Sequence, residues 1–390
     1  MTRSARGRLL GLVGITALAL VVSISACGAR SPQGTAEPTA TTSSASPQPT
    51  PSFVLRAAHI IDDRYGWALS DSALSATTDD GATWTTITPP NVPAMTIRGV
   101  YFLDAKHGWA VSALDSNPSQ LQISATADGG STWTTSALGN PDGLFSDSEF
   151  IPAYVDFVDA QHGWVVAMIA SSAGVQPRGA LFHTSDGGAT WDEFQMPLGG
   201  KIEFVSSSVG WLADGQQGSP LYVTSDGGKT WNTATVTPPN GFTSDQAAYT
   251  IPDFTTGTNV ILVTFGSDNQ AAGFYQTADN GATWQLAATV PAAIANPSTT
   301  LASAAQWFAV AIDGKATAEF SNDGSSQTTT TSSGLPVGAG YGNASFTGDG
   351  HGWIASDMQK CAALKTACTE VMALYVTTDA GADWQQVTVP

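Results

Sequence analysis

The chain has 390 residues and a formal net charge of −18 at pH 7, with 42% hydrophobic but only 12% charged residues. Helix-rich surfaces carry about a quarter charged residues, so this composition excludes a mainly helical protein. The negative charge excludes a sequence-independent binder of phosphate backbones, and we expect no nucleic-acid partner. Forty glycines and 21 prolines favour an all-β protein of short strands and turns.

Residues 1–26 predict a signal peptide. A start with three arginines and no acid precedes the apolar run LLGLVGITALALVVSI, which is shorter than the roughly 20 residues of a membrane span. Ile24-Ser25-Ala26-Cys27 resembles a bacterial lipobox. That resemblance implies cleavage before Cys27, its lipidation by palmitate-type chains, and anchoring on the outer face of the cytoplasmic membrane. A plain signal peptide with a coincidental cysteine is the alternative.

Residues 27–52 predict a disordered tether behind the lipidated cysteine. The stretch after Cys27 is rich in Pro, Ser and Thr and has no large apolar residue, so it cannot build a core. As a coil it spans about 30 Å; an extension packed on the domain is the alternative. Without residues 1–26 the net charge becomes −21. Outside the cytoplasm we expect Cys361 and Cys368 to pair in an exposed loop, 358–373, with free thiols as the alternative.

The motif TSDGGATW at 184–191 recurs along the chain. Related segments end at Trp84, Trp133, Trp231, Trp284 and Trp384, and SNDGSS at 321–326 is a seventh copy without Trp. Neighbouring aspartates are 40–58 residues apart, a period typical of propellers and repeat arrays. The aspartates of the seven copies are Asp79, Asp128, Asp186, Asp226, Asp279, Asp323 and Asp379.

A second motif, Gly-Trp within an apolar strand, precedes most copies, as in HGWVVA at 162–167. Together the two motifs contain all twelve tryptophans, which indicates layered packing. Each unit reads as four strands, so we predict an all-β, seven-bladed β-propeller of four-stranded antiparallel blades over residues 53–390. A linear solenoid would favour shorter units. The predicted blades are 53–90, 91–140, 141–197, 198–238, 239–291, 292–336 and 337–390.

The repeated aspartates are predicted to stabilise hairpins, with no catalytic residue among them. The turn needs positive φ, which Gly adopts without steric cost. The carboxylate can accept hydrogen bonds from N–H groups about two residues on, as in an Asx-type turn. Seven copies of one catalytic acid would serve no enzyme, whereas seven copies of one turn serve a propeller.

The motif S/T-x-D-x-G-x-T-W resembles the Asp-box, or BNR repeat, of sialidases, sortilins, xyloglucan hydrolases and photosystem II assembly factors. Its pairing with D-x-x-HGW is most similar to the photosystem II assembly and stability factors, which implies a non-enzymatic scaffold for partner polypeptides. Those proteins carry a basic patch, whereas this chain is acidic. The resemblance therefore supports the scaffold class and not the photosynthetic partner.

Strand parity predicts two different faces. The first–second and third–fourth connections emerge on one side, and the long second–third and blade-to-blade loops emerge on the other, where binding residues concentrate. We expect a monomer that binds a protein or glycan there. The candidate binding residues in two similar loops are Asp147, Glu149, Tyr154, Asp245, Tyr249 and Asp253. Loop capping and core packing are the alternative roles.

A glycoside hydrolase of sialidase or xyloglucanase type is the alternative function. Sialidases use three arginines on the substrate carboxylate, whereas only Arg56 and Arg98 occupy matching first-strand positions here. This pair could bind an anion or neutralise nearby carboxylates. His107, His162 and His351 share one position before Gly-Trp, where turn packing is expected instead of a metal site. We predict no cofactor, no metal and no catalytic residue.

Overall fold

The computed structural model divides the chain into two units, Met1–Thr50 and Pro51–Pro390. It describes residues 55–139, 150–169, 178–251, 260–266, 271–279, 281–290, 298–303, 306–310, 316–321, 327–335, 340–347, 350–361 and 368–389. The predictions of a signal peptide, a lipidated Cys27 and a tether lie outside these ranges. Among the described residues, no helix has the length and apolarity needed to cross a bilayer.

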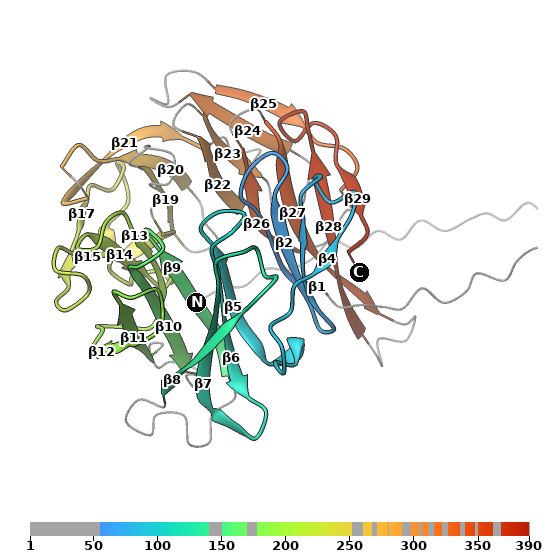
Figure 1. The fold of residues 1–390 in the computed structure, drawn as a ribbon. Helices are drawn as coiled ribbons and strands as arrows, with labels where there is room; N and C mark the ends of the chain where they lie inside the picture. Colours follow the sequence, from blue (N-terminus) through green and yellow to red (C-terminus); the bar gives the residue numbers. More distant parts are fainter. Residues whose placement is uncertain are drawn as a thin grey trace, which may run out of the picture. The chain divides into compact units, whose positions relative to one another are not determined.

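The second unit is an all-β propeller, and its described strands form seven sheets (Figure 1). Six sheets have four antiparallel strands, each paired with its neighbours in the chain. The tight first–second and third–fourth connections contribute to this meander, because a tight turn returns a strand beside the one before it. One sheet has five strands instead of the predicted four.

The first four sheets contain strands as follows. The first has β1 (Leu55–Ile60), β2 (Gly66–Ser70), β3 (Leu74–Thr77) and β4 (Thr85–Thr86). The second has β5 (Ile97–Phe102), β6 (Gly108–Leu114), β7 (Asn117–Thr126) and β8 (Thr134–Gly139). The third has β9 (Phe150–Phe157), β10 (Gly163–Ile169), β11 (Arg178–Thr184) and β12 (Asp192–Phe194). The fourth has β13 (Lys201–Phe204), β14 (Gly210–Ala213), β15 (Tyr222–Thr224) and β16 (Asn232–Thr233).

The remaining sheets follow in chain order. The fifth has β17 (Thr235–Val236), β18 (Ala247–Tyr249), β19 (Val260–Phe265), β20 (Ala271–Gln276) and β21 (Thr283–Thr289). The sixth has β22 (Ser298–Ser303), β23 (Gln306–Val310), β24 (Ala316–Ser321) and β25 (Gln327–Thr331). The seventh has β26 (Gly340–Phe346), β27 (Gly352–Cys361), β28 (Cys368–Thr377) and β29 (Gln385–Val387). Among the described residues, the 3-10 helix η1 (Ala94–Thr96) lies between the first and second sheets, and η3 (Ser244–Gln246) lies between β17 and β18 of the fifth sheet.

The extra strand of the fifth sheet comes from the connection that precedes it. Strand β17 pairs in parallel with β21, and Thr235 N donates to the carbonyl of Ala282 at 3.2 Å. An isolated parallel bridge from Ser333 to Asp383 covers the seventh sheet in the same way. The motif tryptophans at these two edges, Trp284 and Trp384, are buried. Their counterparts Trp133, Trp191 and Trp231 remain half-buried.

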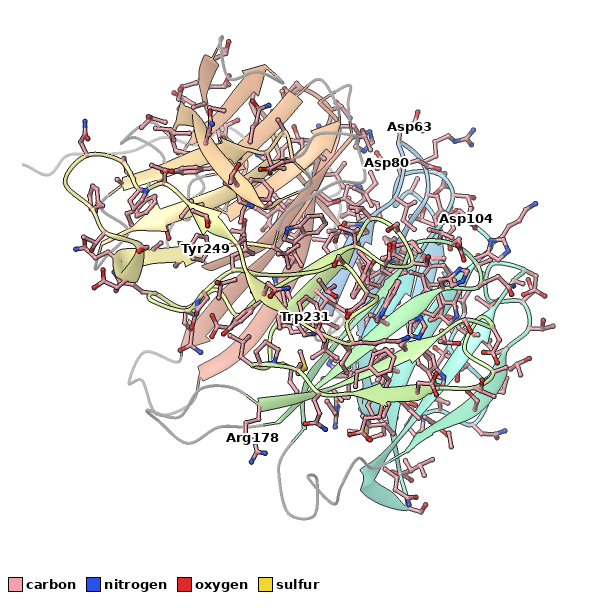
Figure 2. All side chains as sticks on the ribbon, turned by 90° about the vertical axis from the view of Figure 1, so that its left-hand side faces the viewer. Asp63, Asp80, Asp104, Arg178, Trp231 and Tyr249 are labelled. Atoms are coloured by element: carbon pink, nitrogen blue, oxygen red, sulfur yellow. The ribbon has the colours of Figure 1, made fainter. Side chains whose placement is uncertain are left out.

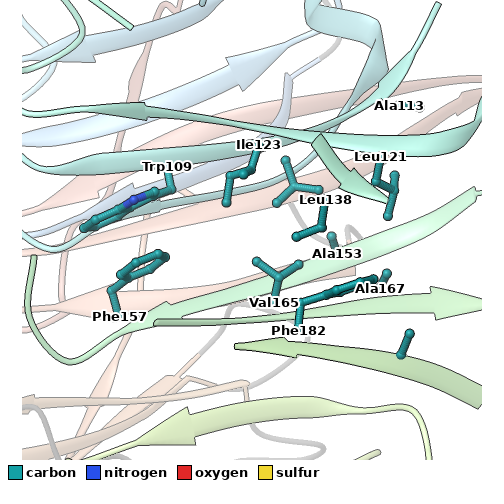
Figure 3. Packing of buried hydrophobic residues seen from close by; sticks show 12 residues of the cluster. Trp109, Ala113, Leu121, Ile123, Leu138, Ala153, Phe157, Val165, Ala167 and Phe182 are labelled. Carbon is teal, nitrogen blue, oxygen red and sulfur yellow. The ribbon is translucent and has the colours of Figure 1, made fainter. Parts of the chain in front are cut away.

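The core lies between the sheets, whose faces pack on one another. Figure 3 shows the cluster between the second and third sheets, in which Trp109 stacks on Phe157 at 3.5 Å between ring centroids. Trp164 stacks in the same way on Phe204 of the fourth sheet at 3.6 Å. The glycine before each Trp explains the Gly-Trp motif. A Cβ on Gly163 would lie 2.2 Å from the ring of Phe157, which crosses it on the paired strand.

The seventh sheet packs against the first. One apolar cluster joins Leu55 and Ile60 of β1 to Trp353 and Leu374 of the last sheet. Ser345 Oγ also donates to the carbonyl of Ile60 at 3.2 Å. Among the described strands, the first and last sheets exchange none, since each contains only consecutive strands. Side chains therefore hold this contact, which we name the closing interface.

Residues 358–373, expected as a loop, are largely strand. Strand β27 continues to Cys361 and β28 begins at Cys368, and the antiparallel register pairs these two residues. The register places the two cysteines opposite each other, and the disulfide itself stays a prediction.

Candidate binding face

The Asp turns are closed by local hydrogen bonds. Asp186 Oδ1 accepts from Thr190 N at 2.9 Å and from the Thr184 hydroxyl at 2.8 Å, while Oδ2 accepts from the Thr190 hydroxyl at 2.6 Å. These donors, those of Thr190 first, lower the pKa of Asp186 to about 2. The sequence predicted hydrogen bonds from N–H groups about two residues after the aspartate. In the structure the Asp186 carboxylate accepts from the N–H four residues on and from two threonine hydroxyls. Such a carboxylate is ionised near neutral pH, and its oxygens accept the hydrogen bonds that close the turn.

The same arrangement recurs in four other described Asp turns. It holds for Asp79, Asp128, Asp226 and Asp279, whose pKa values are also lowered by hydrogen bonds from the corresponding threonines. In the last turn Asp383 replaces the second threonine, so Asp379 accepts from Asp383 N and the Thr377 hydroxyl. The predicted seventh aspartate, Asp323, lies outside the described residues.

The Asp turns and the first–second turns lie on one side of the sheets. Gly187 N donates to the carbonyl of Gln161, and Gly129 N donates to that of Lys106, each at 2.9 Å. We call this side the Asp-turn face. The other connections form the long-loop face. Figure 2 shows Asp63, Asp80 and Asp104 at one end of the sheets and Arg178 at the opposite end.

Two of the three histidines before Gly-Trp are held in their own turns. His107 Nδ1 lies 2.9 Å from Asp104 Oδ2, and His162 Nδ1 lies 2.9 Å from Asp159 Oδ2. His351 instead contacts Asp80 in the first sheet. No group of residues that could hold a metal ion occurs in the part of the chain that the structure describes.

The structure describes three of the six loop candidates, Tyr154, Asp245 and Tyr249, and places them in different surroundings. Tyr154 is half-buried in the cluster between the third and fourth sheets, and Tyr249 is buried in the cluster between the fourth and fifth. Burial raises the pKa of both phenols. Asp245 is exposed in η3. Asp147, Glu149 and Asp253 lie outside the described residues.

Arg56 supports a connection between sheets. Its Nη1 and Nη2 donate to the carbonyls of Ala94 and Ile97 at 3.1 and 2.7 Å, and Nε lies 3.8 Å from Asp71 Oδ1. Burial lowers the pKa of Arg56, and Asp71 opposes that shift. The backbone at η1 is thus a main partner, in addition to the carboxylate that the sequence led us to expect.

Arg98 lies close to Arg56 and contacts the same connection. Its Nη1 donates to the carbonyl of Met95 at 2.9 Å. Burial, followed by the charge of Arg56, lowers the pKa of Arg98. The two guanidiniums therefore stand together on the long-loop face, but they hold backbone carbonyls of η1 and its flank and do not form a three-arginine site.

Two further cations on this face were not singled out from the sequence. Arg178 begins β11 and is exposed, and Lys201 begins β13. Lys201 Nζ lies 5.9 Å from the centre of the Tyr154 ring, and burial lowers the pKa of its amine. Their position at the starts of first and third strands was the available signal, since such positions open onto the long-loop face.

Asp156 carries a buried carboxyl group. It was not singled out from the sequence, because it lies within the apolar strand β9. Its Oδ2 accepts from Phe204 N, which joins the first strands of the third and fourth sheets. Burial raises the pKa of Asp156 to about 7. This carboxyl is 5% exposed, so it belongs to the interface between sheets and not to the binding face.

No family model matches the chain, and no curated protein matches it. The solved structure of YCF48 bound to D1 peptide is similar over 75% of this chain and 80% of that chain, at 17% identity and TM-score 0.46. The GH74 enzyme of Niastella koreensis is similar over 88% of this chain and 63% of that chain, at 15% identity and TM-score 0.37. A prolyl endopeptidase is similar over 86% of this chain and 49% of that chain, at 10% identity and TM-score 0.53. At these identities the likeness shows the propeller fold alone.

Proposed function

We propose that this protein is a non-enzymatic binding scaffold, a closed ring of seven blades that holds a polypeptide on its long-loop face. The supporting observation is a set of four cations at strand ends. Arg56, Arg98, Arg178 and Lys201 stand at strand ends on that face of a chain with net charge −18. On the opposite face the aspartates of the Asp turns already accept threonine donors.

The ligand class follows from these cations and from the resemblance to assembly factors. The four cations, which share this face with Asp71, Asp115, Asp214 and Asp245, can pair with carboxylates of an acidic segment. The resemblance of the Asp-box and D-x-x-HGW motifs to assembly and stability factors favours a polypeptide over a glycan. We therefore propose an acidic stretch of a partner protein as the ligand.

We further propose that Cys27 carries a lipid anchor on the outer face of the cytoplasmic membrane. The lipobox resemblance supports it. A partner at the membrane surface suits this attachment. Replacing Cys27→Ser should move the protein from the membrane fraction to the soluble fraction and abolish labelling by a palmitate analogue. Persistent labelling would contradict the anchor.

The binding face can be tested by charge reversal with a matched control. Arg178 and Lys106 are both exposed, the first on the long-loop face and the second on the Asp-turn face. Crosslinking and capture from detergent-solubilised membranes should recover one set of proteins with the intact chain and with Lys106→Glu, and recover several-fold less with Arg178→Glu. Equal loss in both variants, or loss with Lys106→Glu alone, would refute the assignment of the face.

A further inference from the structure

Two interfaces between described sheets share one hydrogen bond from an indole to a backbone carbonyl. Trp109 Nε1 donates to Gly187 O at 3.0 Å, and Trp164 Nε1 donates to Gly227 O at 2.9 Å. In both cases the acceptor directly follows the aspartate of the Asp turn in the next sheet. The acceptor belongs to the backbone, so it does not depend on which side chain stands there.

The closing interface uses a side chain instead. Trp353 Nε1 donates to Asp80 Oδ1 at 2.9 Å. Asp80 follows Asp79 in the first Asp turn, which is the position of Gly187 and Gly227 in theirs. Its φ is +58°, in the left-handed region that favours glycine. An aspartate that keeps this conformation in place of glycine supplies a carboxylate to the neighbouring sheet.

His351 meets the same oxygen. Its Nε2 lies 2.7 Å from Asp80 Oδ1, and the two side chains are 10% and 28% exposed. The other histidines at this position, His107 and His162, are held by the aspartates three residues before them. The residue three positions before His351 is Gly348, so the position whose aspartate holds His107 and His162 carries a glycine here. Asp80 replaces a glycine of the repeat, and Gly348 replaces an aspartate of the repeat. Both departures affect the contact between Asp80 and His351.

We infer that Asp80, His351 and Trp353, which we call the closing cluster, form a device that keeps the first and seventh sheets together. No strand is exchanged between these sheets among the described residues. One carboxylate oxygen receives both polar contacts, and charge-assisted hydrogen bonds are the stronger kind. The Asp80 carboxylate therefore controls opening at this interface, separately from the interfaces between other sheets.

Asp80→Gly tests the inference because two physical effects oppose each other in it. At φ +58° glycine relieves backbone strain, so a purely local effect would make the variant equal to or more stable than the wild type. Loss of the closing cluster predicts the opposite. The control is Ala380→Gly, since Ala380 has φ +59° at the same position of the last Asp turn.

The measurement is amide hydrogen exchange of the full chain, read by strand. Asp80→Gly should speed exchange in β1 and β27 roughly tenfold or more relative to Ala380→Gly, with β10 and β14 unchanged. Asp80→Asn keeps an acceptor for Trp353 and is the more conservative substitution. It should give an intermediate acceleration of amide exchange in β1 and β27. His351→Ala should add little once Asp80 is glycine. No acceleration, acceleration spread evenly over all sheets, or additive effects of the two substitutions would overturn the inference.

Discussion

The interface between the third and fourth sheets and the closing interface have the same plan but different chemistry. In the former, Trp164 stacks on Phe204 and donates to a backbone carbonyl. In the latter, Ile60 stands where Phe204 stands, at the end of the first strand before the turn, and Trp353 donates to the carboxylate of Asp80. The aromatic ring near Trp353 is Trp84, tilted by 53° at 5.8 Å.

The difference shows how the first and last described sheets pack together without an exchanged strand among the described residues. The second–third and third–fourth interfaces rely on stacking and on backbone acceptors, which tolerate changes of side chain. The closing interface brings together units from the two ends of the sequence and relies on particular side chains instead. Its stability can therefore vary while the other interfaces keep theirs.

The largest expected effect is at the interior stack. Trp164→Ala should lower the free energy of unfolding by about 3–5 kcal/mol, because it empties a buried site. Trp353→Ala should lower it by about 1 kcal/mol less, since no stacked ring is lost there. Urea unfolding of both variants measures the difference. An equal or larger loss for Trp353→Ala would erase the contrast between the interfaces.

An intermediate effect is expected for Asp156→Asn at the interior interface. Folding raises the pKa of Asp156 from 3.8 to about 7, so its contribution is complete below about pH 4 and is lost as pH rises through 7. Asparagine still accepts from Phe204 N but does not ionise. The variant should therefore be more stable than the wild type at pH 8, by about 2 kcal/mol, and lose less stability between pH 5 and 8.

The measurement is thermal unfolding across that pH range, with Asp115→Asn as the control at an exposed aspartate. Parallel pH profiles for the wild type and Asp156→Asn would show that this carboxyl does not couple the third and fourth sheets to pH. The sign matters, because the Asp turns behave in the opposite way. Their lowered pKa values make their contribution fall only in acid, as pH drops below about 4.

The smallest effects concern single hydrogen bonds between first strands. Tyr101→Phe removes the bond from the hydroxyl to Phe157 O at an interior interface, and Ser345→Ala removes the bond to Ile60 O at the closing one. Each should cost about 0.5–1.5 kcal/mol. Ser345→Ala should cost more, because Ser345 is buried whereas Tyr101 is half-buried. Chemical denaturation compares them, and a larger cost for Tyr101→Phe would reverse the expected order.

The repeated motifs predicted the propeller, its strand meander and the structural use of the aspartates. These features were accessible because they depend on neighbours in the chain: Thr190 N reaches Asp186 from four residues away, and each strand pairs with the next. The two faces followed from strand parity for the same reason. The sequence also suggested the anchor at Cys27 and the disulfide, and both stay predictions.

What the tertiary structure alone decided are contacts between units. Arg56 donates to a carbonyl 38 residues away, Phe204 N reaches Asp156 from 48 residues away, and Trp353 meets Asp80 across 273 residues. No spacing rule connects such residues, because their distance in space depends on how whole sheets pack face to face. The repeat can be recognised in the sequence because its hydrogen bonds join residues that are close in the chain. The contacts between residues that depart from the repeat depend on how the sheets pack, and the sequence does not show them.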